Sequence, residues 1–362
     1  MPVSGLEGRL GDLELAPRST RIADGILATI GRTPLVRLRQ YLPAAGFHLF
    51  AKLEALNPGG SIKDRPAVAI LEDGLASGAI GPDTVIVESS SGNMGIGLAQ
   101  ACRYHGLQFI CVVDAKTTAQ NIAILRAYGA DIEVVLQPDP ETGELLPARL
   151  ERVAALVREI GDAFWPNQYA NLLNPREHYR STMREVAAAL DDRVDYLFIA
   201  VSTCGTLRGC CEHVRDRKLA TRVFAVDAVG SVVFGGCRSE RLIPGLGAGL
   251  QPPLWHAGLV DECIHVTDAE SIAGCRRLVA REAILAGGSS GSVMAAIEKT
   301  ADRLAAGANC VAILPDRGER YLETIYDDAW VGAHFGRVEQ PHLARGGARA
   351  TAGRQQPVAA GA

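Results

Sequence analysis

The stretch Asn57-Pro58-Gly59-Gly60-Ser61-Ile62-Lys63-Asp64-Arg65 decides how the rest of this chain is interpreted. It follows an apolar run at residues 47–53 that predicts a strand, and it opens a helical pattern at residues 63–76. The Pro-Gly-Gly turn places Lys63 at a helix start, where backbone N–H groups and the neighbouring Arg65 disfavour an ammonium group. A neutral amine is a nucleophile, so the stretch indicates Schiff-base chemistry at Lys63. Taken alone, it also fits a surface lysine that opens a helix.

Short apolar runs alternate with helical patterns along most of the chain, which predicts parallel strands joined by crossover helices. We therefore expect an α/β fold of two doubly wound parallel-sheet domains, with the active site in the cleft between them. The expected strands are 34–38, 47–54, 85–87, 109–113, 132–136, 196–201, 223–227, 263–266 and 310–314. The expected helices are 26–30, 63–76, 93–104, 119–128, 148–160, 176–190, 206–217, 269–283 and 290–303.

Composition divides the chain into segments. Residues 1–22 mix charge, Gly and Pro without periodicity and predict a flexible arm, and residues 23–56 are expected to pack on the larger domain. Residues 57–166 predict a smaller, mobile α/β domain, and residues 167–336 a larger one, joined at the polar segment NQYAN. Residues 337–362 have almost no bulky apolar side chains and predict a disordered tail.

The bulk composition excludes several classes of protein. Of the 362 residues, 22% are charged and 48% are apolar, and the net charge of −4 gives no general attraction to nucleic acid or to an anionic membrane. The nine cysteines contain no C-x-x-C pair, which argues against a metal site or a disulfide framework and favours the cytoplasm. No apolar run is long enough for a signal peptide or a membrane span.

Two further loops each stand between an expected strand and an expected helix. Ser89-Ser90-Ser91-Gly92-Asn93-Met94-Gly95 offers hydroxyl and N–H groups that suit a carboxylate, and the Asn93 amide can donate to a phenolate-like oxygen. Ser202-Thr203-Cys204-Gly205-Thr206 has the pattern of a phosphate cradle without the lysine of a nucleotide P-loop, which favours a small monophosphate over ATP. Each loop alone also fits a plain helix cap.

Three segments in the second half of the chain can also be considered as parts of a ligand site. Gly245-Leu246-Gly247-Ala248-Gly249 does not lie between a strand and a crossover helix, so a dinucleotide site is not expected there. Gly287-Gly288-Ser289-Ser290-Gly291 presents a hydroxyl where the backbone can approach something flat, and the segment 315–321 is placed to close the same cleft. A lysine amine, a phosphate cradle, an Asn for a ring oxygen and a Ser for a ring nitrogen together describe a pyridoxal-phosphate site.

The motifs NPGGSIKDRP, ESSSGNMG, NQYAN, STCGT, GLGAG, GGSSG and LPDRGERYL resemble, in order and spacing, the fold-type II pyridoxal-phosphate enzymes of the cysteine synthase and cystathionine β-synthase family. The resemblance covers residues 24–332 and implies that Lys63 holds the cofactor as an internal aldimine. It implies that Asn93 meets the ring hydroxyl and Ser289 the ring nitrogen. The residues that it assigns to the phosphate, on the larger domain, are Ser202, Thr203, Cys204, Gly205 and Thr206, and those for the substrate carboxylate are Ser90, Ser91 and Gln168.

The assignment of a serine, Ser289, to the nitrogen of the cofactor ring has a mechanistic consequence. A serine hydroxyl cannot keep a pyridine nitrogen protonated as an aspartate would, so the ring is a weaker electron sink. Loss of a leaving group from Cβ is then favoured over transamination. The expected reaction type is β-replacement.

Some motifs depart from the cysteine synthase pattern. That family usually shows GTGGT-like and TSGNTG-like loops where this chain has STCGT and SSGNMG, which argues against sulfide as the nucleophile. The stretches VVDAKTTAQNIAILRAYGADIEVV, NQYANLLNPREHY, AVDAVGSVVFGG and LPDRGERYLETIYDDAW are similar to the branch of the family that supplies 2,3-diaminopropionate. This likeness implies a homodimeric transferase that condenses O-phospho-L-serine with L-glutamate for siderophore biosynthesis. It assigns substrate contacts to Arg149, Tyr169 and Ser202, and Lys116 is a further candidate.

Other functions stay open at this stage. They are cysteine synthase activity with O-acetylserine or O-phosphoserine and sulfide, cystathionine β-synthase-like activity, and supply of diaminopropionate for a peptide antibiotic. A non-catalytic scaffold is a different class, and the joint presence of Lys63, Asn93 and Ser289 argues against it.

Overall fold

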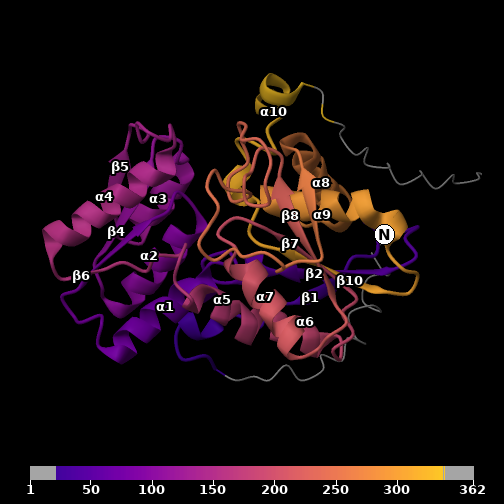
Figure 1. Cartoon of the computed structure of the whole chain (residues 1–362), viewed down its shortest axis with the longest axis horizontal. Coiled ribbons are helices and arrows are strands. Elements are labelled where there is room, and N and C mark those ends of the chain that lie inside the picture. The colour runs from indigo at the N-terminus through magenta and orange to yellow at the C-terminus, as the bar shows by residue number, and fades with distance from the viewer. Residues whose placement is uncertain (1–21, 337, 339–362) are drawn as a thin grey trace, which may run out of the picture.

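The structure is a computed structural model that describes residues 22–336 and residue 338. Two separate sheets form its framework (Figure 1). The larger sheet contains β1 (Leu35–Arg37), β2 (His48–Leu53), β7 (Tyr196–Ala200), β8 (Arg222–Ala228), β9 (Glu262–Val266) and β10 (Asn309–Leu314). The smaller sheet contains β3 (Val85–Ser89), β4 (Phe109–Asp114), β5 (Asp131–Val135) and β6 (Ala163–Phe164). Apart from residues 22 and 338, the arm expected at 1–22 and the tail expected at 337–362 lie outside the described residues.

Strand order confirms the prediction of an α/β fold with parallel sheets. The larger sheet runs β1-β2-β10-β7-β8-β9, and the smaller one runs β5-β4-β3-β6. Every neighbouring pair is parallel except β1 with β2, which is antiparallel and forms one edge of the larger sheet. Such order requires crossover connections, which the helices supply.

Helices cover both faces of the larger sheet. Phe198 of β7 packs with α8 (Asp268–Glu282) and α9 (Gly288–Thr300). Its neighbour Leu197 packs on the opposite face, with α7 (Gly205–Asp216) and α6 (Arg184–Ala189). Successive residues of a strand point to opposite faces, so both faces of this sheet carry apolar side chains and both are buried.

The smaller sheet is arranged in the same way. Ile86 of β3 packs with α1 (Asp64–Ser77) and α2 (Asn93–His105), and α3 (Ala119–Ala127) contributes Leu125 to the same cluster. Val87 packs on the other face, against α4 (Leu145–Ile160). The loops at the carboxyl ends of both sheets therefore lead into helices, which is where parallel α/β proteins place their ligands.

Several elements differ from the sequence expectation. The helix expected at 176–190 is divided into α5 (Leu173–His178), a π-helical turn (Tyr179–Met183) and α6, and the Tyr179 carbonyl in that turn accepts a hydrogen bond from Nδ1 of His213 on α7. The short strand β6 and the helix α10 (Asp328–Phe335) were not expected. Short 3₁₀ turns occur at Leu27–Thr29, Glu54–Leu56, Ala301–Arg303 and Glu319–Tyr321.

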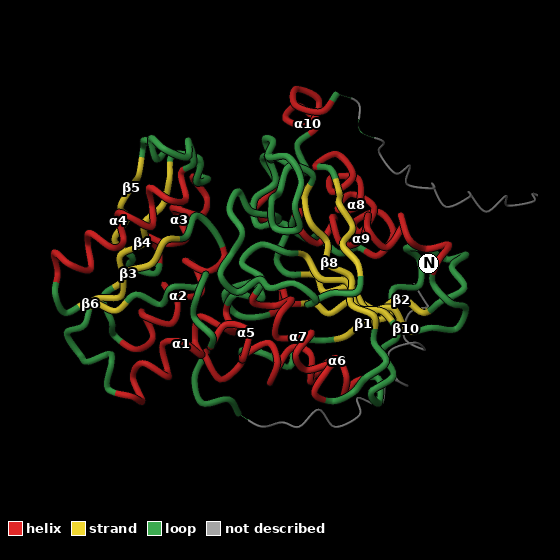
Figure 2. Tube along the Cα trace, viewed as in Figure 1, coloured by secondary structure: helices red, strands yellow, loops and turns green. Residues whose placement is uncertain are grey.

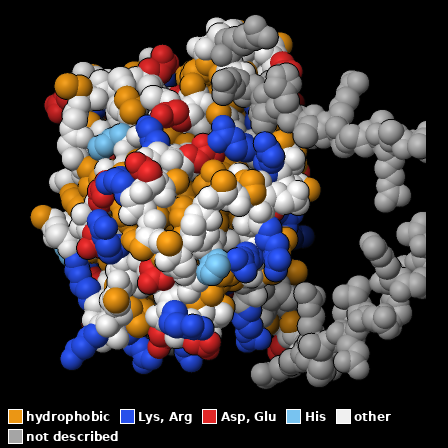
Figure 3. Space-filling view, turned by 90° about the vertical axis from the view of Figure 1, so that its right-hand side faces the viewer, with side chains coloured by type: hydrophobic (Ala, Val, Ile, Leu, Met, Phe, Trp, Pro, Cys, Tyr) orange, Lys and Arg blue, Asp and Glu red, His pale blue; other side chains and the backbone are white. Residues whose placement is uncertain are grey.

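Figure 2 shows the strands of the two sheets as separate groups with loops between them. Figure 3 shows one face of the molecule, on which basic and acidic side chains are interspersed. In the part of the chain that the structure describes, no helix combines the length and the apolar character that a membrane span requires.

Candidate active site

Lys63 lies between the end of β10, in the larger sheet, and α1, which packs on the smaller sheet. Its backbone immediately precedes α1, and its N–H donates to Ser61 Oγ at 3.2 Å. The preceding turn is tied to the end of β10, because the Ile62 N–H donates to the Pro315 carbonyl at 2.8 Å. Gly60 has a φ of +88°, and a Cβ there would lie 2.9 Å from the Arg320 guanidinium, so this turn needs glycine.

The Lys63 amine is easier to deprotonate than an ordinary lysine. Burial lowers its pKa to about 8, while the nearby Asp316 and Cys204 act in the opposite direction. The expectation that Arg65 contributes to this effect was wrong. The Arg65 guanidinium is directed to Glu54 and Glu185, at 2.7 Å from each, and forms a buried ion-pair network instead.

The loop that is predicted to hold a phosphate lies between β7 and the start of α7. Cys204 has a left-handed φ of +67°, and a Cβ on Gly205 would lie 2.0 Å from Asn174 Oδ1. Thr206 Oγ1 is 3.2 Å from Nε2 of the buried His178. Burial lowers the pKa of His178 well below its usual value, so the imidazole is neutral and its ring supports the loop without adding charge.

This loop fits a phosphate group. The Thr203 hydroxyl is buried and has no hydrogen-bond partner among the described residues. The first N–H groups of α7 also lack partners within the helix, since no preceding turn can accept from them. A buried hydroxyl and free N–H groups at a helix N-terminus are donors that a phosphate would satisfy.

Asn93 is held between two side chains of the segment after β10. Its Nδ2 donates to Asp316 Oδ2 at 2.8 Å, and its Oδ1 accepts a hydrogen bond from Arg320. Tyr321 donates to the same Asp316 oxygen at 2.6 Å. The amide nitrogen carries two N–H groups, so one remains for a ligand. Sequence reasoning placed the segment 315–321 at the cleft but gave Asp316 no role.

Arg149 forms a second polar cluster with Ser91 and Asp114. The Arg149 side chain is buried, its Nη1 donates to Ser91 Oγ at 2.6 Å, and its Nε lies 3.3 Å from Asp114 Oδ2. Ser91 in turn donates to Asp114 at 3.0 Å. Asp114 is a residue that sequence reasoning missed, although its place at the end of the buried strand β4 was a signal.

The remaining predicted substrate residues lie on the loops beside this cluster. Gln168 Nε2 donates to the Ser89 carbonyl at 3.1 Å, and its backbone N–H donates to Glu88 at 3.1 Å. Burial raises the pKa of Glu88 to about 7. Ser90 Oγ accepts from the Gly95 N–H at 2.9 Å, so part of its capacity is used within its own loop. Burial raises the pKa of Tyr169 to about 12, which keeps its phenol protonated.

These side chains surround one cavity of about 340 Å³. It is lined by every predicted site residue, namely Lys63, Ser90, Ser91, Asn93, Lys116, Arg149, Gln168, Tyr169, Ser202, Thr203, Cys204, Gly205, Thr206 and Ser289. A second cavity of about 900 Å³ shares part of the lining.

Residues 26–316 match the family described as "Pyridoxal-phosphate dependent enzyme", and the chain belongs to this family of enzymes. The predicted cofactor, pyridoxal 5′-phosphate, is thereby confirmed. The chain is 48% identical to the N-(2-amino-2-carboxyethyl)-L-glutamate synthase of Cupriavidus metallidurans, over 89% of this chain and 95% of that one. It is also 48% identical to the synthase of the same name from Ralstonia nicotianae, over 86% and 91%. Among solved structures, the O-acetylserine-dependent cystathionine β-synthase of Helicobacter pylori is 31% identical, with a TM-score of 0.79 over 85% of this chain and all of that one.

Proposed function

We propose that this enzyme condenses O-phospho-L-serine with L-glutamate to N-(2-amino-2-carboxyethyl)-L-glutamate and phosphate. The names of the two relatives at 48% identity support this reaction. The structural observation that carries it is the meeting of Lys63 and Arg149 in one cavity with Tyr169 and Ser202. A phosphate leaving group and a dicarboxylate nucleophile both require positive charge or N–H donors near the reacting carbon.

The proposed cofactor contacts rest on the family resemblance, and the presence of these residues around one cavity supports them. Lys63 would bind the cofactor covalently, the free N–H of Asn93 would donate to its ring hydroxyl, and Ser289 would serve its ring nitrogen. The residues proposed for the phosphate are Ser202, Thr203, Cys204, Gly205 and Thr206. When bound, pyridoxal phosphate supplies the electron sink that makes the substrate Cα acidic.

The protein's own side chains would then bind the substrates and transfer one proton. Ser90, Ser91 and Gln168 bind the carboxylate of O-phospho-L-serine and hold its Cα near Lys63. Once the substrate amine has displaced Lys63 from the cofactor, the freed Nζ would accept the Cα proton, and its lowered pKa suits it to act as a base near neutral pH. The Cβ–O bond would break as phosphate leaves, the glutamate nitrogen would form the new Cβ–N bond and lose one proton to the departing phosphate, and Nζ would return its proton to Cα.

Arg149, Tyr169 and Ser202 are proposed to recognise the substrates at the reacting end. Arg149 is oriented by Ser91 and Asp114 and can still offer N–H groups to an anion. The protonated Tyr169 phenol can donate a hydrogen bond to the leaving phosphate.

A competition experiment tests this proposal. The purified enzyme is given O-phospho-L-serine together with L-glutamate, sulfide and L-homocysteine, and the products are separated by mass spectrometry. N-(2-amino-2-carboxyethyl)-L-glutamate is expected as the main product. Cysteine as the main product would assign the enzyme to cysteine synthesis, and cystathionine to a cystathionine β-synthase-like reaction.

The choice of leaving group gives an independent test. We expect kcat/KM with O-phospho-L-serine to exceed that with O-acetyl-L-serine by about tenfold or more, because the site offers a cationic side chain to the leaving group. Equal values for the two substrates would contradict the proposed role of the phosphate.

The wider setting is also proposed from the same likeness. The product would be a precursor of L-2,3-diaminopropionate for a siderophore, made in the cytoplasm by a homodimer. We further propose that residues 57–166 form the mobile domain and residues 167–336 the larger, phosphate-binding one, with residues 23–56 packed on the latter. Small-angle scattering should then show a decrease in the radius of gyration when O-phospho-L-serine is added, whereas an unchanged radius would contradict mobility.

A further inference from the structure

The second cavity opens directly beside the catalytic one. The two cavities share the side chains of Asp114, Lys116, Arg149, Tyr169 and Ser202. The outer walls come from opposite sheets, since residues 136–146 follow β5 and residues 247–253 precede β9. A molecule bound in the second cavity would therefore lie directly beside a substrate bound in the catalytic cavity.

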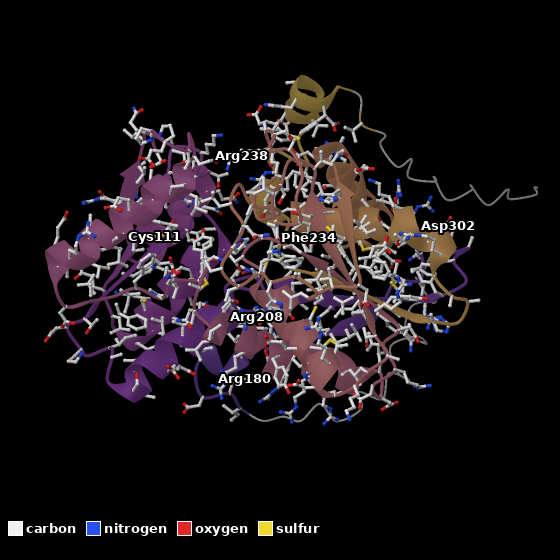
Figure 4. All side chains as sticks on the ribbon, viewed as in Figure 1. Cys111, Arg180, Arg208, Phe234, Arg238 and Asp302 are labelled. Carbon is white, nitrogen blue, oxygen red and sulfur yellow. The ribbon has the colours of Figure 1, made fainter. Side chains whose placement is uncertain are left out.

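The charges in the lining do not balance. Asp114 is paired with Arg149 at 3.3 Å, and Glu144 is paired at 3.1 Å with Arg238, which is labelled in Figure 4. Lys116 and Arg241 line the cavity as well, and neither forms an ion pair within the described residues. In the part of the chain that the structure describes, Lys116 and Arg241 therefore have no carboxylate at ion-pair distance, and only the more distant Asp227 and Asp268 act on Arg241 electrostatically.

Arg241 is held in place but is not saturated. Its Nη1 donates to the Leu246 carbonyl at 3.1 Å, and the guanidinium lies so close to Gly247 that a Cβ there would be 2.7 Å from Nη1. Its Nε is buried and has no hydrogen-bond partner in the described part of the chain. A guanidinium with unused donors is a preferred partner for a carboxylate.

Lys116 is placed by the end of β4. Its backbone N–H donates to Asp114 Oδ1 at 2.9 Å, which fixes the start of the side chain. Lys116 lines both cavities, whereas Arg241 lines only the second one. The two cations thus lie at different depths along the path to the reacting carbon.

We propose that this second cavity is the binding site for the amino donor, a dicarboxylic amino acid, and that Lys116 and Arg241 bind its two carboxylates. Lys116 takes the α-carboxylate next to the attacking amine, and Arg241 takes the side-chain carboxylate. The inference rests on the proposed function, since it assigns a place to that function's second substrate. A sulfide nucleophile would need neither cation.

The substitution Arg241→Gln tests this assignment. The KM for L-glutamate should rise about tenfold or more, while the KM for O-phospho-L-serine should stay within about twofold. The preference for L-glutamate over L-glutamine should fall by a similar factor, because the variant no longer pairs with the second carboxylate. The control Arg303→Gln removes an exposed arginine that is ion-paired with Glu262 and should leave all three values unchanged. An unchanged KM for L-glutamate, or an equal rise for both substrates, would overturn the proposal.

Glutarate separates failure of this inference from failure of the proposed function. It has both carboxylates of glutamate but no amine, so it can bind without reacting. Calorimetric titration of the holoenzyme should show binding of glutarate that is about tenfold weaker in Arg241→Gln and unchanged in Arg303→Gln. If wild-type enzyme gives no product with L-glutamate, the proposed reaction fails, and the titration still tests the site. Equal affinity of wild type and Arg241→Gln for glutarate would overturn the site itself.

Discussion

The lowered pKa of Lys63 makes a quantitative prediction about how the apoenzyme takes up its cofactor. Only a neutral amine can attack the aldehyde of pyridoxal phosphate. With a pKa of about 8 in place of the usual 10.5, about 9% of Lys63 is neutral at pH 7, against about 0.03% of an ordinary lysine. The difference is a factor of about 300 in the reactive form. Because the amine is neutral above its pKa, the rate of uptake should rise with pH and level off above pH 9.

Uptake can be followed in stopped flow by the visible absorbance of the lysine-linked cofactor. Each rate is divided by that of n-propylamine with pyridoxal phosphate at the same pH, which removes the titration of the cofactor itself. The ratio should be largest near neutral pH and should fall between about pH 8 and 10.5, because Lys63 is then almost fully neutral while the fraction of neutral n-propylamine is still increasing. Lys63→Arg, which cannot form the link, should give no absorbance. A ratio that does not change with pH would refute the assignment of a lowered pKa to Lys63.

Three further substitutions test separate parts of the structure. Gly205→Ala should lower stability in urea by about 2 kcal/mol or more and weaken cofactor binding, because the new Cβ would overlap the amide packed against it, whereas Gly332→Ala meets no atom within 4 Å and should be nearly neutral. Arg65→Leu should lower the free energy of unfolding by about 3–5 kcal/mol in the same assay, since it leaves the buried Glu54 carboxylate without its ion-pair partner. A decrease of less than about 1 kcal/mol is typical of an exposed ion pair and would contradict a buried network. Arg149→Ala should raise the KM of at least one substrate about tenfold while cofactor content stays intact, and unchanged kinetics for both substrates would remove it from the site.

The repeating elements of the fold could be predicted because they are local. The apolar runs at 85–87 and 109–113 lie within β3 and β4, and their buried side chains alternate between two faces as the period of a strand requires. The strand β6 is only two residues long and joins the smaller sheet through β3, so no periodicity could reveal it. The π turn at Tyr179–Met183 could not be predicted from local pattern, because its Tyr179 carbonyl contacts His213, which lies on a later helix of the sequence.

In the site, too, features set by neighbouring residues could be predicted, and contacts between residues far apart in the sequence could not. The loops that hold Lys63, Asn93 and Ser289 could be recognised because each is a short motif at a helix start. The role of Asp316 could not, because its hydrogen bond to Asn93 joins residues that are 223 positions apart. The expected effect of Arg65 on Lys63 failed for a related reason. Neighbours in sequence at a helix start can point in different directions, and Arg65 turns to Glu185 instead.

The order of strands in the larger sheet constrains how the chain can fold as it leaves the ribosome. All four strands of the smaller sheet come from one uninterrupted stretch, residues 85–164, so that sheet can assemble as soon as this stretch has been synthesised. In the larger sheet, by contrast, β10 is the strand that links β1 and β2 to β7, β8 and β9. The early strands β1 and β2 must therefore wait for residues 309–314 before they can join their sheet. During synthesis, the unpaired edge of β2 is the kind of surface that a holding chaperone binds. A premature stop before residue 309 would leave this edge unpaired and prone to aggregation.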